Sequence, residues 1–396
     1  MENNIFLTRT NLILLFLFCP VLLKNGMLGS FMVVAITICL MFPSVLKNRN
    51  VFPVSLYYGS VIFVLFLLLN TIVTVVSPFY PLKFFSYVVS FLFGYLICHM
   101  GITPYCSKKY ICFIIIIPLF VFFFVKEKME GGLFDLANTY VYYGLTASLF
   151  YYMCDYTNSK SLLLTWGILG VFVLSATKLG ILLAIFVSTA FYYVRSLKHI
   201  ILFIGIILGT ILAIIYIDIP VFLRIRNVYE LATNIPLEAY RNIGDSSAYE
   251  IGELYGTSNS GENDTSFVFR LVYWTKLLKY WMDSDFIHIL FGYGDMYVKE
   301  NFGLQPHNEY IKLLLENGIC VFLIFCKFTI YVFNSLKPLK IRYLLFTPLV
   351  FIFTENILYF SFMNFLFFLV VGYFCCYSNE RDINETNSHM YVEKNV

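Results

Sequence analysis

The chain has 396 residues, of which 60% are hydrophobic and only 13% are charged, with a mean hydropathy of +0.78. Soluble domains carry about 25% charged residues, so this composition excludes a soluble globular protein. The formal net charge of +3 is too small to indicate a protein that binds nucleic acid. We therefore expect an all-α polytopic integral membrane protein.

Apolar segments that approach the roughly 20 residues of a membrane crossing recur along the chain. We predict about twelve transmembrane helices, at 10–23, 28–46, 54–76, 82–99, 109–125, 138–154, 161–177, 179–194, 199–217, 317–335, 341–356 and 358–377. The first segment is followed by further spans and lacks a small-residue cleavage site, so we predict a membrane helix there and not a removed signal peptide.

The spans divide the chain into four predicted parts. These are transmembrane helices 1–9 (1–217), one long polar loop with short helices (218–308), an amphipathic helix with helices 10–12 (309–377), and a tail (378–396). Basic residues in short loops number twelve on the side of the N-terminus and five, Lys83 among them, on the other. Because Lys and Arg accumulate on the cytoplasmic side, we predict cytoplasmic termini and a periplasmic loop.

The ten cysteines are scattered, nearly all within or beside apolar segments, and no C-x-x-C pair occurs. The sequence therefore predicts neither a disulfide framework nor a zinc site. Cysteine is expected to serve here as a small apolar residue.

The long loop is acidic, with twelve Asp and Glu against seven Lys and Arg, so it is not a polybasic membrane-surface patch. Apolar residues at helical spacing predict a helix over Phe267–Met282. The helix should stop at Asp283–Asp285, and a further break is expected at Gly292–Gly294.

His307 follows Pro306 and precedes the predicted helix 309–316, for which His307 or Asn308 can be the N-cap. On that helix Glu309, Lys312 and Glu316 share one face. Imidazole titrates near neutral pH and suits a general base for a hydroxyl group. From the residues alone, His307 is either such a base or a solvated loop and capping residue.

Several basic residues are candidate anion-binding groups. Arg270, four residues before Trp274 on the predicted helix, has a guanidinium fork that can hold two phosphate oxygens, or it is an exposed helix arginine. Arg224 and Arg226 either bind anionic groups or anchor a helix end. Lys178 lies between two apolar segments, where an ammonium is costly and often functional unless it reaches the membrane surface.

Taken in order, these motifs resemble one family. A Ser-x-x-Lys-x-Gly junction (Ser175–Gly180), an Arg-x-x-x-Trp helix (Arg270–Trp274), a Gly-x-Gly turn (Gly292–Gly294) and the His-Asn-x-Tyr segment (His307–Gly318) are similar to the O-antigen polymerase and O-antigen ligase superfamily. The family commonly has Arg at the junction, and Lys178 lacks the bidentate fork.

The resemblance implies transfer of a glycan from undecaprenyl diphosphate at the periplasmic face of the bacterial inner membrane. It makes His307 the base and Arg270 a catalytic cation. Residues implied in binding diphosphate or sugar are Lys178, Arg224, Arg226, Asn308 and Tyr310. A diphosphate leaves without a proton, and the sequence shows no dense carboxylate cluster, so we expect inverting chemistry without metal or cofactor.

The acceptor decides between two activities. A polymerase transfers the growing chain to a new lipid-linked repeat unit, whereas a ligase transfers it to lipid A core. We favour the polymerase because the loop is compositionally skewed, as expected of an enzyme fitted to one repeat unit. A lipid-linked oligosaccharide flippase is the alternative from another class. Expected partners are the undecaprenyl-linked donor and acceptor, membrane lipid and a chain-length regulator, and no nucleic acid.

Overall fold

The computed structural model describes residues 34–35, 37–74, 79–102, 137–155, 164–165, 167–169, 197–217, 266–336, 348–349, 352, 358 and 361–393. Within these residues the chain forms helices and turns and no strand. The predicted site residues Lys178, Arg224 and Arg226 lie outside the described residues, as do the predicted spans 10–23, 109–125 and 179–194.

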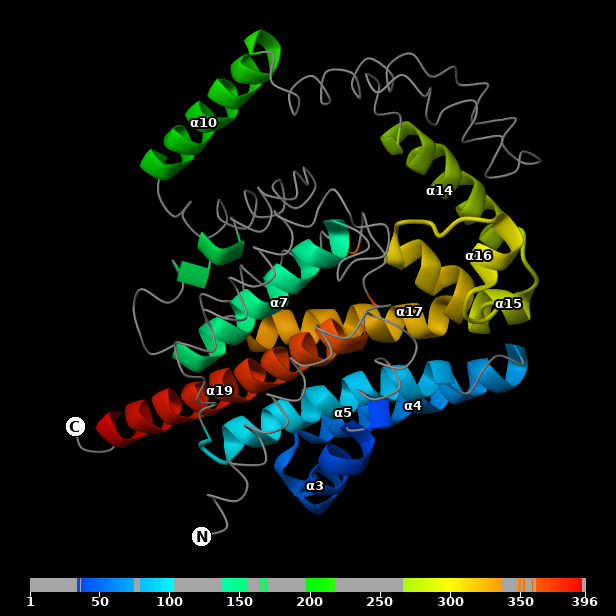
Figure 1. Cartoon of the computed structure of the whole chain (residues 1–396). Coiled ribbons are helices and arrows are strands. Elements are labelled where there is room, and N and C mark those ends of the chain that lie inside the picture. Colours follow the sequence, from blue (N-terminus) through cyan, green and yellow to red (C-terminus); the bar gives the residue numbers. More distant parts are fainter. Residues whose placement is uncertain are drawn as a thin grey trace, which may run out of the picture.

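The described helices agree with the expected all-α fold (Figure 1). They are η2 (Thr37–Met41), α3 (Phe42–Lys47), η3 (Arg49–Val51), α4 (Val54–Thr74), α5 (Phe79–His99), α7 (Ala137–Asp155), α10 (Leu197–Tyr216), α14 (Ser266–Met282), α15 (Phe286–Phe291), α16 (Tyr297–Phe302), α17 (Glu309–Ser335) and α19 (Ser361–Glu393). Among them, α4, residues Pro81–His99 of α5 and α17 are long and apolar enough to cross a membrane. The total of about twelve spans stays a prediction.

Helices α5 and α19 pack against each other so closely that side chains are excluded at two positions. A Cβ atom on Gly94 would lie 2.0 Å from the Leu369 carbonyl oxygen, and one on Gly372 would lie 2.0 Å from the Phe91 carbonyl oxygen. Small residues allow such backbone approach between membrane helices. Helix α7 packs on α19 and contributes Tyr142 to the core.

The two helices run in the same direction. Ser90 Oγ donates to the Phe365 carbonyl at 2.7 Å, and further along both helices His99 Nδ1 lies 2.9 Å from Glu380 Oε1. In the predicted topology, the spans 82–99 and 358–377 also cross the membrane in the same direction. The parallel packing therefore agrees with the predicted order of crossings.

Helix α17 is kinked at Gly318, whose backbone has φ 74° and ψ 175°. This conformation is almost restricted to glycine. The kink coincides with the predicted boundary between the amphipathic helix 309–316 and the span that begins at 317. One end of α17 thus carries the candidate site, and the rest continues beside α4.

Helices α14, α15 and α16 gather at the N-terminal end of α17 (Figure 1). The predicted helix Phe267–Met282 is confirmed as α14, and both predicted breaks are present. A small apolar core joins these helices to α17. Its buried members are Val272, Tyr273, Trp274, Leu277, Val298, Ile311 and Leu315.

Candidate functional site

The segment that leads to His307 is bound to α14 by two side chains. Tyr273 donates its hydroxyl to the Leu304 carbonyl at 2.7 Å, and the Trp274 indole N–H donates to the Pro306 carbonyl at 2.5 Å. The second bond is buried and ends one residue before His307. The Trp of the Arg-x-x-x-Trp motif therefore holds the backbone from which the histidine projects.

Arg270 lies one helical turn before Trp274 on α14, because residues four apart occupy the same face of a helix. Its side chain is partly exposed. The two residues favoured as catalytic, Arg270 and His307, therefore come from segments that the structure fastens together, although 36 positions of sequence separate them.

His307 itself has φ 49°, in the left-handed region that non-glycine residues rarely adopt. Such conformations persist only where the surroundings impose them, and they cluster at functional sites. Asn308 follows as the N-cap of α17, and its side-chain oxygen accepts from the backbone N–H groups of Tyr310 and Ile311 at 3.0 and 3.1 Å. The N-cap alternative predicted for Asn308 is confirmed.

Asn308 and Tyr310 already have partners within the protein. Asn308 is buried, and its amide oxygen caps the helix. The Tyr310 hydroxyl donates to the Leu349 carbonyl at 3.0 Å, and its ring packs edge-on against Phe322 and Phe325. Through these contacts the two residues stabilise the backbone around the site. Their predicted role in substrate binding stays a prediction.

The Gly-x-Gly turn contacts the kink of α17 through its backbone. The N–H groups of Tyr293 and Gly294 donate to the carbonyls of Leu315 and Glu316 at 2.8 and 2.9 Å. A Cβ atom on Gly292 would lie 2.5 Å from the Asn317 nitrogen. The turn thus supplies the donors that the interrupted helix cannot provide for its own last carbonyls.

Asn70 of α4 ties the same turn to the membrane helices. The Asn70 side chain is buried, and its amide nitrogen donates to the carbonyls of Phe291 and Glu316, the second at 3.2 Å. An amide inside an apolar helix needs such partners, since an unpaired buried polar group costs about 1–3 kcal/mol.

Beneath the turn lies a buried cluster of ionisable side chains that the sequence did not reveal. Its members, whose charges act on one another, are Lys83, Asp295, Glu309, Lys312 and Glu316. Lys83, Glu309, Lys312 and Glu316 are each at most 6% exposed. The Lys312 ammonium lies 3.6 Å from Glu316 Oε2.

This ionic cluster corrects one expectation and shows what covers a predicted helix face. Lys83 was assigned to a short loop, but it lies in α5 and is buried beneath α17. When Lys83 is removed from the count of loop residues, the bias of basic residues toward the side of the N-terminus keeps its direction. The polar face of Glu309, Lys312 and Glu316 follows the predicted pattern, yet it is buried and does not face solvent. Hydrophobic periodicity locates such a face but not what covers it.

Asp295 shows how the cluster is balanced electrostatically. Burial raises the pKa of its carboxyl, and the charges of Lys312 and Lys83 act in the opposite direction. Asp295 Oδ1 and Glu309 Oε2 are buried and accept no hydrogen bond from the protein. Buried ions are costly unless paired and fully bonded, so these two oxygens add to the cost of burying the cluster.

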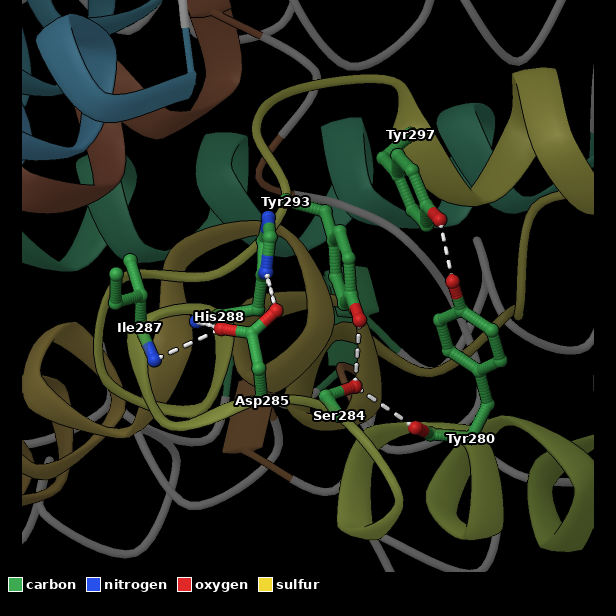
Figure 2. A network of polar contacts seen from close by, with 7 residues as sticks. All are labelled: Tyr280, Ser284, Asp285, Ile287, His288, Tyr293 and Tyr297. Atoms are coloured by element: carbon green, nitrogen blue, oxygen red, sulfur yellow. Dashed lines mark hydrogen bonds and ion pairs between the residues drawn. The ribbon is translucent and has the colours of Figure 1, made fainter.

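A second histidine, which the sequence analysis did not single out, lies on α15. His288 Nδ1 is 2.5 Å from Asp285 Oδ2, and its ring stacks on Tyr293 with centroids 4.1 Å apart (Figure 2). Tyr293 stacks in turn on Tyr297 at 4.3 Å, and the Tyr293 hydroxyl donates to Ser284. Because Tyr293 is the middle residue of the Gly-x-Gly turn, the stacked rings connect α15 through this turn to the start of α16.

The Asp285–His288 pair is a carboxylate that orients an imidazole, an arrangement also used by general bases. The hydrogen bond from His288 lowers the pKa of the Asp285 carboxyl. Asp285 caps α15 at the same time, accepting from the N–H groups of Ile287 and His288. Only the spatial pairing, not a sequence motif, distinguishes this histidine from the others.

Long apolar helices with a buried ionic cluster at one end are the features of an integral membrane protein that holds charged groups near one membrane face. A family model described as O-antigen ligase matches residues 163–326. The match confirms the motif-based resemblance of this region to the O-antigen polymerase and ligase superfamily. A comparison with the curated proteins found no match.

The matched region contains all seven site residues predicted from the sequence. It also contains the cluster residues Asp295, Glu309, Lys312 and Glu316, whereas Lys83 of α5 lies outside it. Polymerase and ligase activities are both compatible with the match, and both act on lipid-linked glycans.

Proposed function

We propose that the protein is an O-antigen polymerase, which transfers the growing glycan from undecaprenyl diphosphate to a new lipid-linked repeat unit. The observation that carries the proposal is the buried Trp274–Pro306 hydrogen bond, which fastens the Arg270 helix to the His307 backbone beside the ionic cluster. A candidate base, His307, and a candidate cation, Arg270, are thereby held near the N-terminal end of α17.

The proposed reaction is a single displacement. The acceptor hydroxyl oxygen attacks the anomeric carbon, the bond to the diphosphate oxygen breaks, and the diphosphate keeps the electron pair. His307 takes the hydroxyl proton. Negative charge accumulates on the leaving diphosphate, so fixed positive charge there lowers the barrier, and Arg270 is the described residue best suited to supply it.

The ionic cluster extends this proposal. Lys83 and Lys312 are buried amines that lie beside the carboxyl groups of Asp295, Glu309 and Glu316, near the end of α17 that carries Asn308. We propose that these two amines supply positive charge to the diphosphate when the donor is bound. Lys178, Arg224 and Arg226 are proposed to contribute from the adjoining segments.

An apolar cavity among the membrane helices supports a lipid-tailed substrate. Its volume is about 240 Å³, and it lies between α4, α5 and α17. Most of its lining is aliphatic or aromatic, and Phe84 and Tyr87 at its border follow Lys83 in α5. A polyprenyl chain in this cavity would have its diphosphate end near the buried lysines.

The polymerase proposal is tested by the lipopolysaccharide ladder of a strain that lacks the gene. Loss of a polymerase leaves core capped by one repeat unit. Bare core, with polymer accumulated on the undecaprenyl carrier, would instead identify a ligase. Loss of both products from the outer face would identify a flippase.

Residue roles are tested in the complemented strain. His307→Ala should reduce transfer by about 10²–10⁴-fold, the usual contribution of a positioned base. His307→Gln retains hydrogen bonding but cannot take the proton, so full activity of this variant would refute the base role. Arg270→Ala should abolish polymer, and Arg270→Lys should restore it only in part because the fork is lost.

The membrane orientation is proposed from the bias of basic residues. Alkaline phosphatase fused at Ser258 should be active, whereas fusions at Asn48 or after Glu380 should be inactive. The reverse pattern would place the site on the cytoplasmic side and exclude the proposed substrate.

A further inference from the structure

Two cysteines, a glutamate and a histidine meet where α5 and α19 end together, far from the glycan site. Cys98 of α5 is 6% exposed, Cys376 of α19 is fully buried, and Glu380 follows one turn later. The two sulfur atoms and a Glu380 oxygen all lie within 4.8 Å of one another. No other such group of donors occurs among the described residues.

The spacing of these donors is compatible with a tetrahedral zinc ion. With Zn–S near 2.3 Å and Zn–O near 2.1 Å, tetrahedral angles require S···S of about 3.8 Å and S···O of about 3.6 Å. Cys376 Sγ lies 3.7 Å from Glu380 Oε1. A metal ion could therefore bind between these groups with little movement of the backbone.

His99 offers a fourth donor. It is adjacent to Cys98 in α5, and its Nδ1 lies 2.9 Å from the same Glu380 oxygen. About half of each of these two side chains is exposed, 48% for His99 and 43% for Glu380, so a hydrated ion can reach the site. The imidazole needs only to turn from the carboxylate toward the ion.

We propose that Cys98, His99, Cys376 and Glu380 form a structural zinc site that joins the ends of α5 and α19. Two thiolates with imidazole and carboxylate favour zinc over the harder magnesium and calcium ions. In the predicted orientation this end faces the cytoplasm, where thiols stay reduced and are available as ligands.

The packing of the two helices prepares the site. The glycine contacts at Gly94 and Gly372 fix the register of α5 against α19 close to the donors. At 1.5 Å per residue, the fifteen positions from Lys83 to Cys98 place the zinc site about 22 Å from the ionic cluster. The zinc ion would therefore hold the helices together without taking part in transfer.

The test is the metal content of the full-length protein, purified in detergent without chelator or affinity metal. Wild type should contain about one zinc ion per chain, as a closed site predicts. After exchange with cobalt it should show a sulfur-to-cobalt charge-transfer band. Cys98→Ser and Glu380→Gln should lose zinc, and the partly exposed Glu380 makes the second change tolerable for folding.

Cys375→Ser is the matched control, because Cys375 is equally buried on α19 but outside the donor group. It should retain zinc and the cobalt band. Wild type that neither contains zinc nor takes up zinc or cobalt on dialysis would overturn the proposal. So would a disulfide between Cys98 and Cys376, equal zinc in Glu380→Gln, or equal loss in the control.

Discussion

Replacing Gly318 by alanine should separate the candidate site from the membrane part of α17. The new Cβ would lie 2.2 Å from the Leu290 carbonyl oxygen and 2.6 Å from the Gly292 nitrogen, both backbone atoms that cannot rotate away. The backbone conformation at φ 74° and ψ 175° adds strain of about 1–3 kcal/mol for a non-glycine residue. With about 1–3 kcal/mol for overpacking, we expect a total loss of about 2–6 kcal/mol.

Thermal unfolding of the purified protein in detergent measures this loss, and the lipopolysaccharide ladder reports its effect on function. Gly303→Ala is the matched control: Gly303 also has a positive φ, of 83°, but no atom lies within 4 Å of its added Cβ. It should lose only the conformational part, about 1–2 kcal/mol. Equal stability of the two variants would refute the backbone contact between the turn and the kink.

Three further predictions follow from the same contacts. Trp274→Phe should leave the buried Pro306 carbonyl without its donor, at a cost of about 1–3 kcal/mol. It should also shorten the polymer at normal protein levels. An unchanged ladder would show that the indole does not position His307. Asp295→Asn should raise the melting temperature at neutral pH. The raised pKa of Asp295 means that folding favours the protonated carboxyl, so the wild type loses stability as pH rises. The melting temperatures of the two proteins should converge near about pH 4, and a variant less stable than wild type at neutral pH would contradict this sign. Gly94→Val should prevent α5 from packing on α19 and remove the protein from the membrane fraction, whereas Gly59→Val, where nothing lies within 4 Å, should accumulate normally.

Local sequence patterns predicted many of the helix boundaries around the candidate site. The α14 boundaries differ from the predicted ones by a single residue, since the apolar spacing and the Asp283–Asp285 break are local signals. The Asn308 cap and the boundary at Gly318 were predictable for the same reason. The match over residues 163–326 confirms the family to which these motifs pointed.

Contacts between distant segments could not be predicted in this way. The burial of Lys83 depends on α17, which covers it, and no property of α5 alone shows that. Cys98 and Cys376 form no C-x-x-C motif, and they become neighbours only because α5 and α19 pack in parallel.

The contact between the Gly-x-Gly turn and the kink of α17 is made by main-chain atoms alone. The donors belong to Tyr293 and Gly294, and the acceptors to Leu315 and Glu316, so none of these bonds depends on side-chain identity. The side chains of Tyr293, Leu315 and Glu316 can therefore be exchanged while the backbone bonds keep the turn in place against α17. The chemical groups that the turn presents and its position against α17 are thus set by different atoms.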